Sequence, residues 1–266
     1  MALYARAEGN WLSVASLISL MADVCGAEAP GVRSSISRLK RRGIILSERH
    51  AGQAGYSLAA STLEVLAEGD VRIFERRRAT AEDGWIMVVF SVPESEREKR
   101  HALRTTLTRL GFGTAAPGVW VAPGNLGSET RHTLERRGLA PYVDIFQGDY
   151  VAFGDPRAKV SSWFDLDELT AMYADFLHRY RPVLYRTTSG AMDPQGAFSE
   201  YVPMLTHWRR LPYRDPGLPM SLLPPGWIGE SAGALFDDLN QVLSPLAQKH
   251  ALSVIHGGEK EAGGGR

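Results

Sequence analysis

The segment from Pro30 to Arg42 reads PGVRSSISRLKRR, and it decides how the N-terminal part of the chain folds. Apolar residues recur in it at helical spacing, at Val32, Ile36 and Leu39, and Gly43 follows as a stop signal. Proline is well placed in the first turn of a helix, because its missing N–H would have no helical partner there. The sequence therefore predicts an amphipathic helix over residues 30–42.

The segments on either side of this helix predict a small motif around it. Before it, Ser13 is a candidate N-cap for a helix, and the next apolar residues lie at positions i, i+3, i+4 and i+7, at Val14, Leu17, Ile18 and Met21. After it, residues 44–49 and 56–58 are strand candidates on either side of a polar, glycine-flanked loop. Two helices joined by a tight turn and followed by a hairpin predict a winged helix-turn-helix.

A helical wheel at 100° per residue assigns roles within residues 30–42. When the apolar stripe faces the domain, the opposite side presents small polar and arginine side chains, as a helix in the major groove of DNA requires. Lys40 is predicted to lie nearer the protein body, and the wing is predicted to contact phosphate or the neighbouring minor groove. The predicted DNA-binding residues are Arg33, Ser34, Ser37, Arg38, Arg41 and Arg42 in the helix, and Arg49, His50 and Gln53 in the wing.

The charge of the chain is concentrated rather than spread. The formal net charge is zero, yet residues 31–50 contain six basic residues and one acid, Glu48. A small basic patch on a neutral body favours localised docking on phosphate over coating of nucleic acid. The alternative, a basic helix face that only meets solvent, stays open on charge alone.

The composition restricts the class of protein and its compartment. A chain of 266 residues with 44% hydrophobic content is long enough for two or three compact domains. The apolar stretches are too short for a membrane span and no secretory signal opens the chain, so we expect a cytoplasmic protein without membrane contact. The single cysteine, Cys25, fits a reducing compartment and is expected to be buried as a small apolar residue.

The rest of the chain predicts two further regions. Residues 62–78 are expected to form a helical connector. Strand candidates at 85–90, 114–122, 142–146 and 149–153, with helical segments at 94–110 and 128–137, predict a two-layer α/β domain. Helices are expected from residue 165, over about 198–210, and over 232–249. The glycine-rich segment from Gly257 to Arg266 cannot bury apolar surface and is expected to be disordered.

Several motifs, in order along the chain, resemble the PaaX family of phenylacetic-acid catabolism repressors. They are residues 32–43, the wing sequence 54–56, 90–94, 111–113, 117–123, 210–212, 215–219, 222–224 and Trp227. The resemblance implies an α+β multidomain protein with an N-terminal winged helix-turn-helix, a central ferredoxin-like domain and a mostly helical C-terminal domain. It also implies a helix before Gly9, where this sequence has only a short segment.

The combined domain prediction is therefore as follows: a DNA-binding domain over residues 1–60, a helical connector over 61–83, a ferredoxin-like domain over 84–156, a helical domain over 157–252, and a disordered tail over 253–266. The resemblance implies a homodimer that binds double-stranded operator DNA as a repressor of an aromatic-acid catabolic operon. It further implies release by an effector, phenylacetyl-CoA or another acyl-CoA. His207, Trp208, Arg209 and Arg210 are candidates for the aromatic wall and the cations of an effector pocket. The alternative, which we favour, is that Trp208 lies in the core and the arginines make surface pairs.

The main alternative function is a metal-dependent nuclease, because the central domain also resembles the ferredoxin-like nucleases of CRISPR adaptation. Those enzymes hold a metal with a carboxylate at the end of the first strand, whereas the matching stretch here is Phe90-Ser91-Val92-Pro93. The chain has no Walker loop, dinucleotide fingerprint, zinc-protease motif or nucleophile elbow. We therefore expect no catalytic or metal-binding residues and no cofactor, and a regulator rather than an enzyme.

Overall fold

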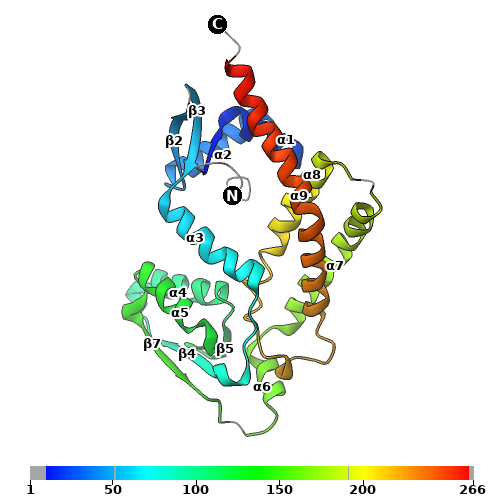
Figure 1. Ribbon diagram of the computed structural model, residues 1–266. Helices are drawn as coiled ribbons and strands as arrows, with labels where there is room; N and C mark the ends of the chain where they lie inside the picture. The colour runs from blue at the N-terminus through cyan, green and yellow to red at the C-terminus, as the bar shows by residue number, and fades with distance from the viewer. Residues whose placement is uncertain (1–9, 51, 152, 191, 264–266) are drawn as a thin grey trace. The chain divides into compact units, whose positions relative to one another are not determined.

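The computed structural model describes residues 10–50, 52–151, 153–190 and 192–263, and it shows a mixed α+β protein (Figure 1). The chain divides into two compact units. The first comprises Met1–Val71, Leu177–His207 and Gly233–Arg266, and the second comprises Arg72–Phe176 and Trp208–Ala232. The helix that the family resemblance implies before Gly9 lies outside the described residues.

The N-terminal part of the first unit contains three helices and a three-stranded antiparallel sheet of order β1-β3-β2. Ser13 caps the first helix by accepting a hydrogen bond from the Ser16 amide, and Gly26 ends it in the left-handed conformation. Pro30 lies in the first turn of the second helix, as expected. The elements are β1 (Trp11–Ser13), α1 (Val14–Cys25), α2 (Ala29–Arg41), β2 (Ile45–His50), β3 (Gln53–Leu58) and α3 (Ala60–Asp70).

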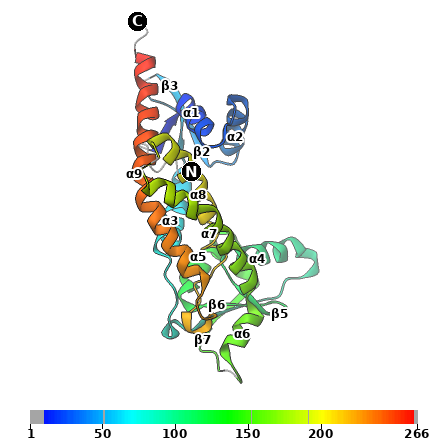
Figure 2. The same ribbon diagram turned by 90° about the vertical axis from the view of Figure 1, so that its right-hand side faces the viewer.

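Three long helices complete the chain after the central region. They are α7 (Leu166–Thr188), α8 (Pro194–Trp208) and α9 (Ile228–Gly263). Within the first unit, α1 contacts both α2 and α9, and it lies between them in Figure 2. The sequence ended the last helix at Lys249 and predicted no structure from Gly257, whereas α9 continues to Gly263. Extending an existing helix is far easier than nucleating one, and the segment from Glu259 to Ala262 consists of good helix formers.

The second unit contains a four-stranded antiparallel sheet of order β5-β6-β4-β7. The chain order β4-α4-β5-β6-α5-β7 gives the split βαβ arrangement of a ferredoxin-like domain. Ile86 and Val88 of β4 point toward the helices and pack with Leu107 in the core. The elements are β4 (Trp85–Phe90), α4 (Arg97–Arg109), β5 (Gly113–Ala116), β6 (Val119–Pro123), α5 (Gly127–Arg136), β7 (Val143–Gly148) and α6 (Pro156–Trp163).

Short helical turns connect these elements, and one predicted strand is absent. Val71–Glu75 is a π-helical turn that directly follows α3. Single 3₁₀ turns lie at Ala81–Asp83, Glu94–Glu96, Gly124–Leu126, Ala140–Tyr142 and Met220–Leu222. The prediction of an extended piece over residues 149–153 was wrong for its described part, because β7 ends at Gly148 and no strand follows. β7 lies at the edge of the sheet and pairs only with β4, whose first residue, Trp85, is opposite Gly148. Residues after Gly148 therefore have no strand to pair with.

A partly buried arginine fixes the connector within the second unit. The Arg72 guanidinium donates to the carbonyl oxygens of Leu110 and Pro212 and to a carboxylate oxygen of Glu129, each at 2.8 Å. It also lies over the ring of Tyr213, 5.0 Å from the ring centre. One side chain thus joins three segments that are far apart in the sequence.

A second arginine, Arg78, makes a similar contact a few residues later. It donates to Asp215 at 2.9 Å, and this buried carboxylate also accepts from the Tyr173 hydroxyl and the Gly217 amide, each at 2.8 Å. Burial, reinforced by the neighbouring Asp215 charge, raises the pKa of Tyr173 well above its usual value. The motif over residues 215–219 therefore serves the packing of this unit.

Candidate nucleic-acid interface

Helix α2 is held to the first unit by a narrow apolar stripe. Val32 and Ile36 are buried, and Leu39 is half-buried. The helix packs against α1 and β2 along this stripe. Its remaining side is open to solvent and carries the exposed residues Arg33, Ser34, Ser37, Arg38, Lys40, Arg41 and Arg42.

The exposure of α2 corrects one detail of the helical wheel. Lys40 was predicted to lie nearer the protein body than its charge suggests, and the structure has it exposed. Its neighbour Leu39 is only half-buried, which shows that the apolar stripe is less covered at this end of the helix than at Val32 and Ile36. Ser35, in contrast, is half-buried on the inner flank.

The arginines of α2 are differently engaged. Arg38 donates to the Ser35 hydroxyl one turn earlier, at 3.0 Å, which restricts its guanidinium to one side of the helix. Within the described part of the chain, no carboxylate pairs with Arg33, Arg41 or Arg42. These cations therefore remain available for an anion that approaches from solvent.

The hairpin β2–β3 ends in a tight turn in which Gly52 has a φ of 83°. Its basic residues already have partners: Arg49 donates to the Gly52 carbonyl at 3.0 Å, and His50 lies 2.9 Å from Glu48. Hydrogen bonds from His50 and Ser57 lower the pKa of Glu48. Arg49 and His50 are exposed, and Gln53 is half-buried. The candidate wing residues thus also order the hairpin in which they lie.

Trp11 anchors the hairpin in a way that sequence reasoning missed. Its ring stacks on His50 with centroids 4.9 Å apart, and its other neighbour is the backbone of Gly55. A Cβ at position 55 would lie 2.3 Å from the Trp11 ring, so only glycine fits there. The family-like wing sequence 54–56 therefore has a structural cause. An isolated glycine within a strand pattern was the available signal.

The candidate effector residues are placed in different surroundings. Trp208 is 1% exposed and lies in the core, where its ring is 4.9 Å from that of Phe176 and its indole N–H donates to the Ile73 carbonyl. His207 is half-buried with its ring 5.6 Å from that of Tyr180. Arg209 and Arg210 are exposed. The indole of Trp208 is thus used for packing and does not face open space.

The structure also shows where the residues considered for nuclease chemistry lie. β4 ends at Phe90, Ser91 follows it, and Glu94 pairs with Arg100 at 2.9 Å. In the part of the chain that the structure describes, no three His, Cys, Asp or Glu residues gather in a way that could hold a metal. No observation therefore favours the nuclease alternative.

Cys25, expected to be buried, is exposed at the last residue of α1, and its thiol lies 3.3 Å from the Met21 carbonyl. The expectation rested on its position in the turn between the helices. At 100° per residue, Cys25 lies away from the buried face of α1 at Ser16, Leu17 and Leu20, so the side chain is exposed. Among the described helices, none is long and apolar enough to cross a membrane.

The exposed basic helix and the domain order are typical of a transcriptional regulator, and the comparisons agree. Three family models match in order: "PaaX-like protein" over residues 1–62, "PaaX protein central Cas2-like domain" over 78–160, and "PaaX-like protein C-terminal domain" over 164–253. The chain belongs to the PaaX family. This family membership supports a transcriptional repressor rather than an enzyme.

Two relatives illustrate the similarity. The chain is 26% identical to "Transcriptional repressor PaaX" of Escherichia coli strain K12 over 224 residues, which cover 81% of this chain and 69% of the relative. Its fold is similar to that of "Uncharacterized protein Rv0674 from Mycobacterium tuberculosis", with a TM-score of 0.60 and 24% identity, over 94% of this chain and 96% of the other.

Proposed function

We propose that the chain is a DNA-binding transcriptional repressor whose α1–β3 region acts as a winged helix-turn-helix with α2 as the recognition helix. The observation that carries the proposal is the division of α2 into a narrow buried stripe and an exposed polar side. A recognition helix needs this division, because it must be fixed to its domain and still reach base edges.

The exposed side of α2 offers two kinds of contact. Arg38 and Arg41 can make bidentate hydrogen bonds to guanine, while Ser34 and Ser37 are small enough to let the duplex approach. Arg33, Lys40 and Arg42 on the flanks are placed for phosphates. In the wing, Arg49, His50 and Gln53 act on the neighbouring backbone or minor groove.

We further propose that the repressor is a homodimer, because a two-fold operator requires two recognition helices. The second unit offers an uncovered part of its sheet for this contact. Met87 of β4 and Phe146 of β7 lie directly opposite each other and are 36% and 54% exposed. Three more exposed apolar residues follow β7, namely Tyr150, Val151 and Phe153. A second copy of the same surface would bury this patch.

The dimer proposal is tested with Phe146→Asp, measured by light scattering after size exclusion. Wild type is expected to run as a dimer and the variant as a monomer, because a charge in an apolar contact cannot be desolvated cheaply. Tyr185→Asp, at a residue 77% exposed in the first unit, serves as the matched control and is expected to remain a dimer. A dimeric Phe146→Asp variant would rule out this surface.

The regulated genes and the signal belong to the same proposal. Membership of the PaaX family supports repression of an aromatic-acid catabolic operon, of the phenylacetate type, with release by phenylacetyl-CoA or another acyl-CoA. Release follows if the effector prefers the conformation whose paired recognition helices no longer match the half-site spacing.

A gel-shift assay on the promoter of the neighbouring operon, with and without phenylacetyl-CoA, tests this function. Arg38→Ala and Arg41→Ala are each expected to weaken specific binding by about 5- to 150-fold, the usual cost of a lost base contact. Lys40→Ala should weaken binding far less and equally on all sequences, as loss of one phosphate contact does. Arg131→Ala, at an exposed residue outside the first unit, is the control.

Three results would contradict this proposal. Equal losses of DNA affinity for Arg38→Ala, Arg41→Ala and Lys40→Ala would mean that the basic side of α2 binds DNA only through its net charge. Absence of salt-sensitive, sequence-specific binding would remove the DNA-binding function. Cutting of the probe that depends on a divalent metal would favour the nuclease.

A further inference from the structure

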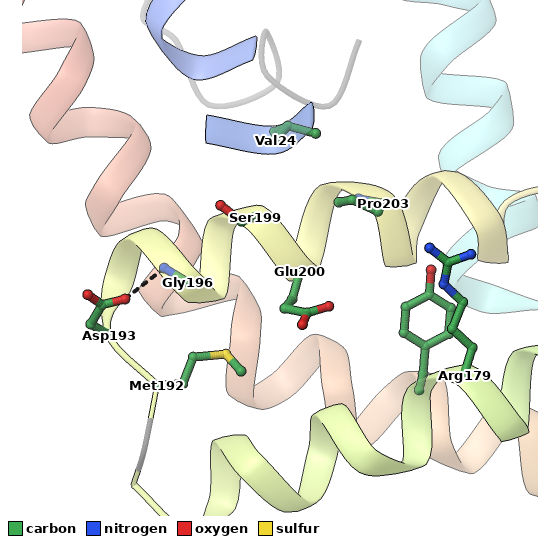
Figure 3. Close-up of a pocket in the computed structure, with 9 residues that line it drawn as sticks. Val24, Arg179, Met192, Asp193, Gly196, Ser199, Glu200 and Pro203 are labelled. Carbon is green, nitrogen blue, oxygen red and sulfur yellow. Dashed lines mark hydrogen bonds between the residues drawn. The ribbon is translucent and has the colours of Figure 1, made fainter. Parts of the chain in front are cut away.

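A cavity of about 700 Å³ lies within the first unit, next to the C-terminal end of α1 (Figure 3). Its wall includes one face of α8, at positions i, i+3, i+4 and i+7, together with residues of α7 and the loop before α8. The volume falls within the usual range for small-molecule sites. The lining residues are Val24, Arg179, Tyr180, Met192, Asp193, Gly196, Ser199, Glu200 and Pro203.

The charged side chains that line this cavity differ in whether they already have a partner. Glu200 accepts from Arg186 at 2.6 Å, and Asp193 accepts from the Gly196 amide at 2.7 Å at the start of α8. Arg179 is exposed and lies over the Tyr180 ring at 5.7 Å, and no carboxylate of the described residues pairs with it. The carboxylates of Glu200 and Asp193 thus already have hydrogen-bond donors. The charged group of the lining without an oppositely charged partner among the described residues is the guanidinium of Arg179.

The remaining lining favours a ligand with an apolar body. Val24, Met192 and Pro203 contribute apolar surface, and Tyr180 adds an aromatic ring. Pro203 has no N–H, so the Ser199 carbonyl lacks the donor that it would have in an unbroken helix. Together with the guanidinium of Arg179, this lining suits an organic anion that carries an aryl or alkyl group.

The same helix that lines the cavity also holds the end of α1. The Ser199 hydroxyl donates to the Asp23 carbonyl at 2.6 Å, and the Gln195 amide donates to the Asp23 carboxylate at 2.8 Å. His250 of α9 lies 2.9 Å from the other carboxylate oxygen. Asp23 precedes Val24, which lines the cavity, and α1 packs directly against α2. Through these contacts, a displacement of α8 would reach the helix pair proposed to bind DNA.

We propose that this cavity is a binding site for a small organic anion with an apolar body, and that its occupation alters α1 and α2 through the Asp23 contacts. The carboxyl or phosphate of the ligand pairs with Arg179, and its apolar part covers Val24 and Met192. The regulatory half of this inference rests on the proposed repressor function, whereas the binding site itself does not. A ligand shifts the conformation only as far as it binds one state more tightly than the other.

The site is tested with 8-anilinonaphthalene-1-sulfonate, an aromatic anion whose fluorescence rises on binding, using the full chain without DNA. Arg179→Gln is expected to weaken binding by about 10-fold or more, as loss of a charge-assisted hydrogen bond does. Arg181→Gln, an exposed arginine two residues along α7 and outside the lining, should bind like wild type. Met192→Trp should also weaken binding, because the larger ring takes up part of the space that the apolar part of the ligand would occupy.

Displacement of the dye by phenylacetate and by phenylacetyl-CoA separates a free acid from a thioester as the source of the anion. Displacement by either supports the site. Equal dye affinity in Arg179→Gln and Arg181→Gln, or no displacement by either compound, would overturn it.

The coupling is tested by hydrogen exchange of the amides of α1 and α2, with and without the displacing compound. Changed protection in wild type that is lost in Arg179→Gln supports transmission. Bound ligand with unchanged protection would overturn the coupling but leave the site. Because neither readout uses DNA, a failure of the repressor function in the gel shift remains distinguishable from a failure of this site.

Discussion

Two arginine-rich segments of the chain look alike in sequence and differ in whether their arginines pair within the protein. The four arginines of the segment from Arg33 to Arg42 meet solvent, and no carboxylate of the described residues pairs with Arg33, Arg41 or Arg42. In the connector, Arg72 and Arg78 are largely covered, with side chains 11% and 26% exposed, and each pairs with a carboxylate. The surroundings, and not the number of arginines, decide whether the charge meets a ligand or the protein itself.

The difference arises from where the partners lie in the chain. Arg72 finds acceptors at Leu110, Glu129 and Pro212, and Arg78 finds one at Asp215, so both depend on contacts between distant segments. The α2 arginines lie opposite a local apolar stripe that turns them outward. Substitutions in the two segments should therefore separate stability from DNA binding.

The largest loss of stability is expected from Asp215→Ala. This change leaves the Tyr173 hydroxyl and one guanidinium nitrogen of Arg78 without their acceptor in a buried environment, while Arg78 keeps its bond to the Leu218 carbonyl. Removing one partner of such a pair costs about 3 kcal/mol or more in the free energy of unfolding, measured by urea denaturation. The exposed Asp238→Ala is the control and should cost less than about 0.5 kcal/mol. If Asp215→Ala loses less than about 1 kcal/mol, the paired Arg78 of the connector contributes no more to stability than the exposed arginines of α2, and the contrast between the two segments fails.

A smaller loss is expected from Arg72→Met, which keeps the apolar stem but leaves the Leu110 and Pro212 carbonyls without their donor. Unsatisfied buried acceptors cost about 1–3 kcal/mol, so we expect a loss of about 2 kcal/mol in the same denaturation assay. The neighbouring Arg77, whose side chain is 74% exposed, provides the comparison. If Arg77→Met costs as much as Arg72→Met, burial does not distinguish these arginines.

The third effect is a loss of about 1 kcal/mol in the free energy of unfolding when Tyr173 is replaced by Phe, and this loss should depend on pH in the alkaline range. The raised pKa of Tyr173 means that the folded protein keeps this phenol protonated where the unfolded chain, near pH 10, ionises it. The contribution is therefore fully present below about pH 10 and is lost as the pH rises toward the folded pKa. Tyr173→Phe should be less stable than wild type at pH 8, and the gap should narrow at about pH 11, as urea denaturation at each pH will show. A constant gap would contradict the assigned environment.

The smallest effect on stability is expected in α2. Arg41→Ala should change the free energy of unfolding by less than about 0.5 kcal/mol, because the side chain is exposed and has no carboxylate partner among the described residues. A large loss of operator affinity without loss of stability would confirm the contrast between the segments. A loss of more than about 1 kcal/mol on urea denaturation would show that this arginine also has a structural role.

The local motifs were predictable from the sequence because they depend on neighbours in the chain. The cap at Ser13, the first turn at Pro30 and the strand at Trp85–Phe90 follow from turn chemistry and periodicity, and the structure has them there. The stacking of Trp11 on His50 and the cavity beside α8 depend on contacts between distant segments. No pattern within a short window contains that information.

The exposed thiol at the end of α1 makes the recognition region measurable. Because Cys25 is the only cysteine of the chain, a maleimide or nitroxide probe would attach there without any further substitution. In a homodimer, each copy would carry one probe, two residues from Asp23 and close to the helix pair proposed to bind DNA. Pulsed electron resonance between the two probes would then report the separation of the two recognition regions directly, in free, ligand-bound and DNA-bound protein.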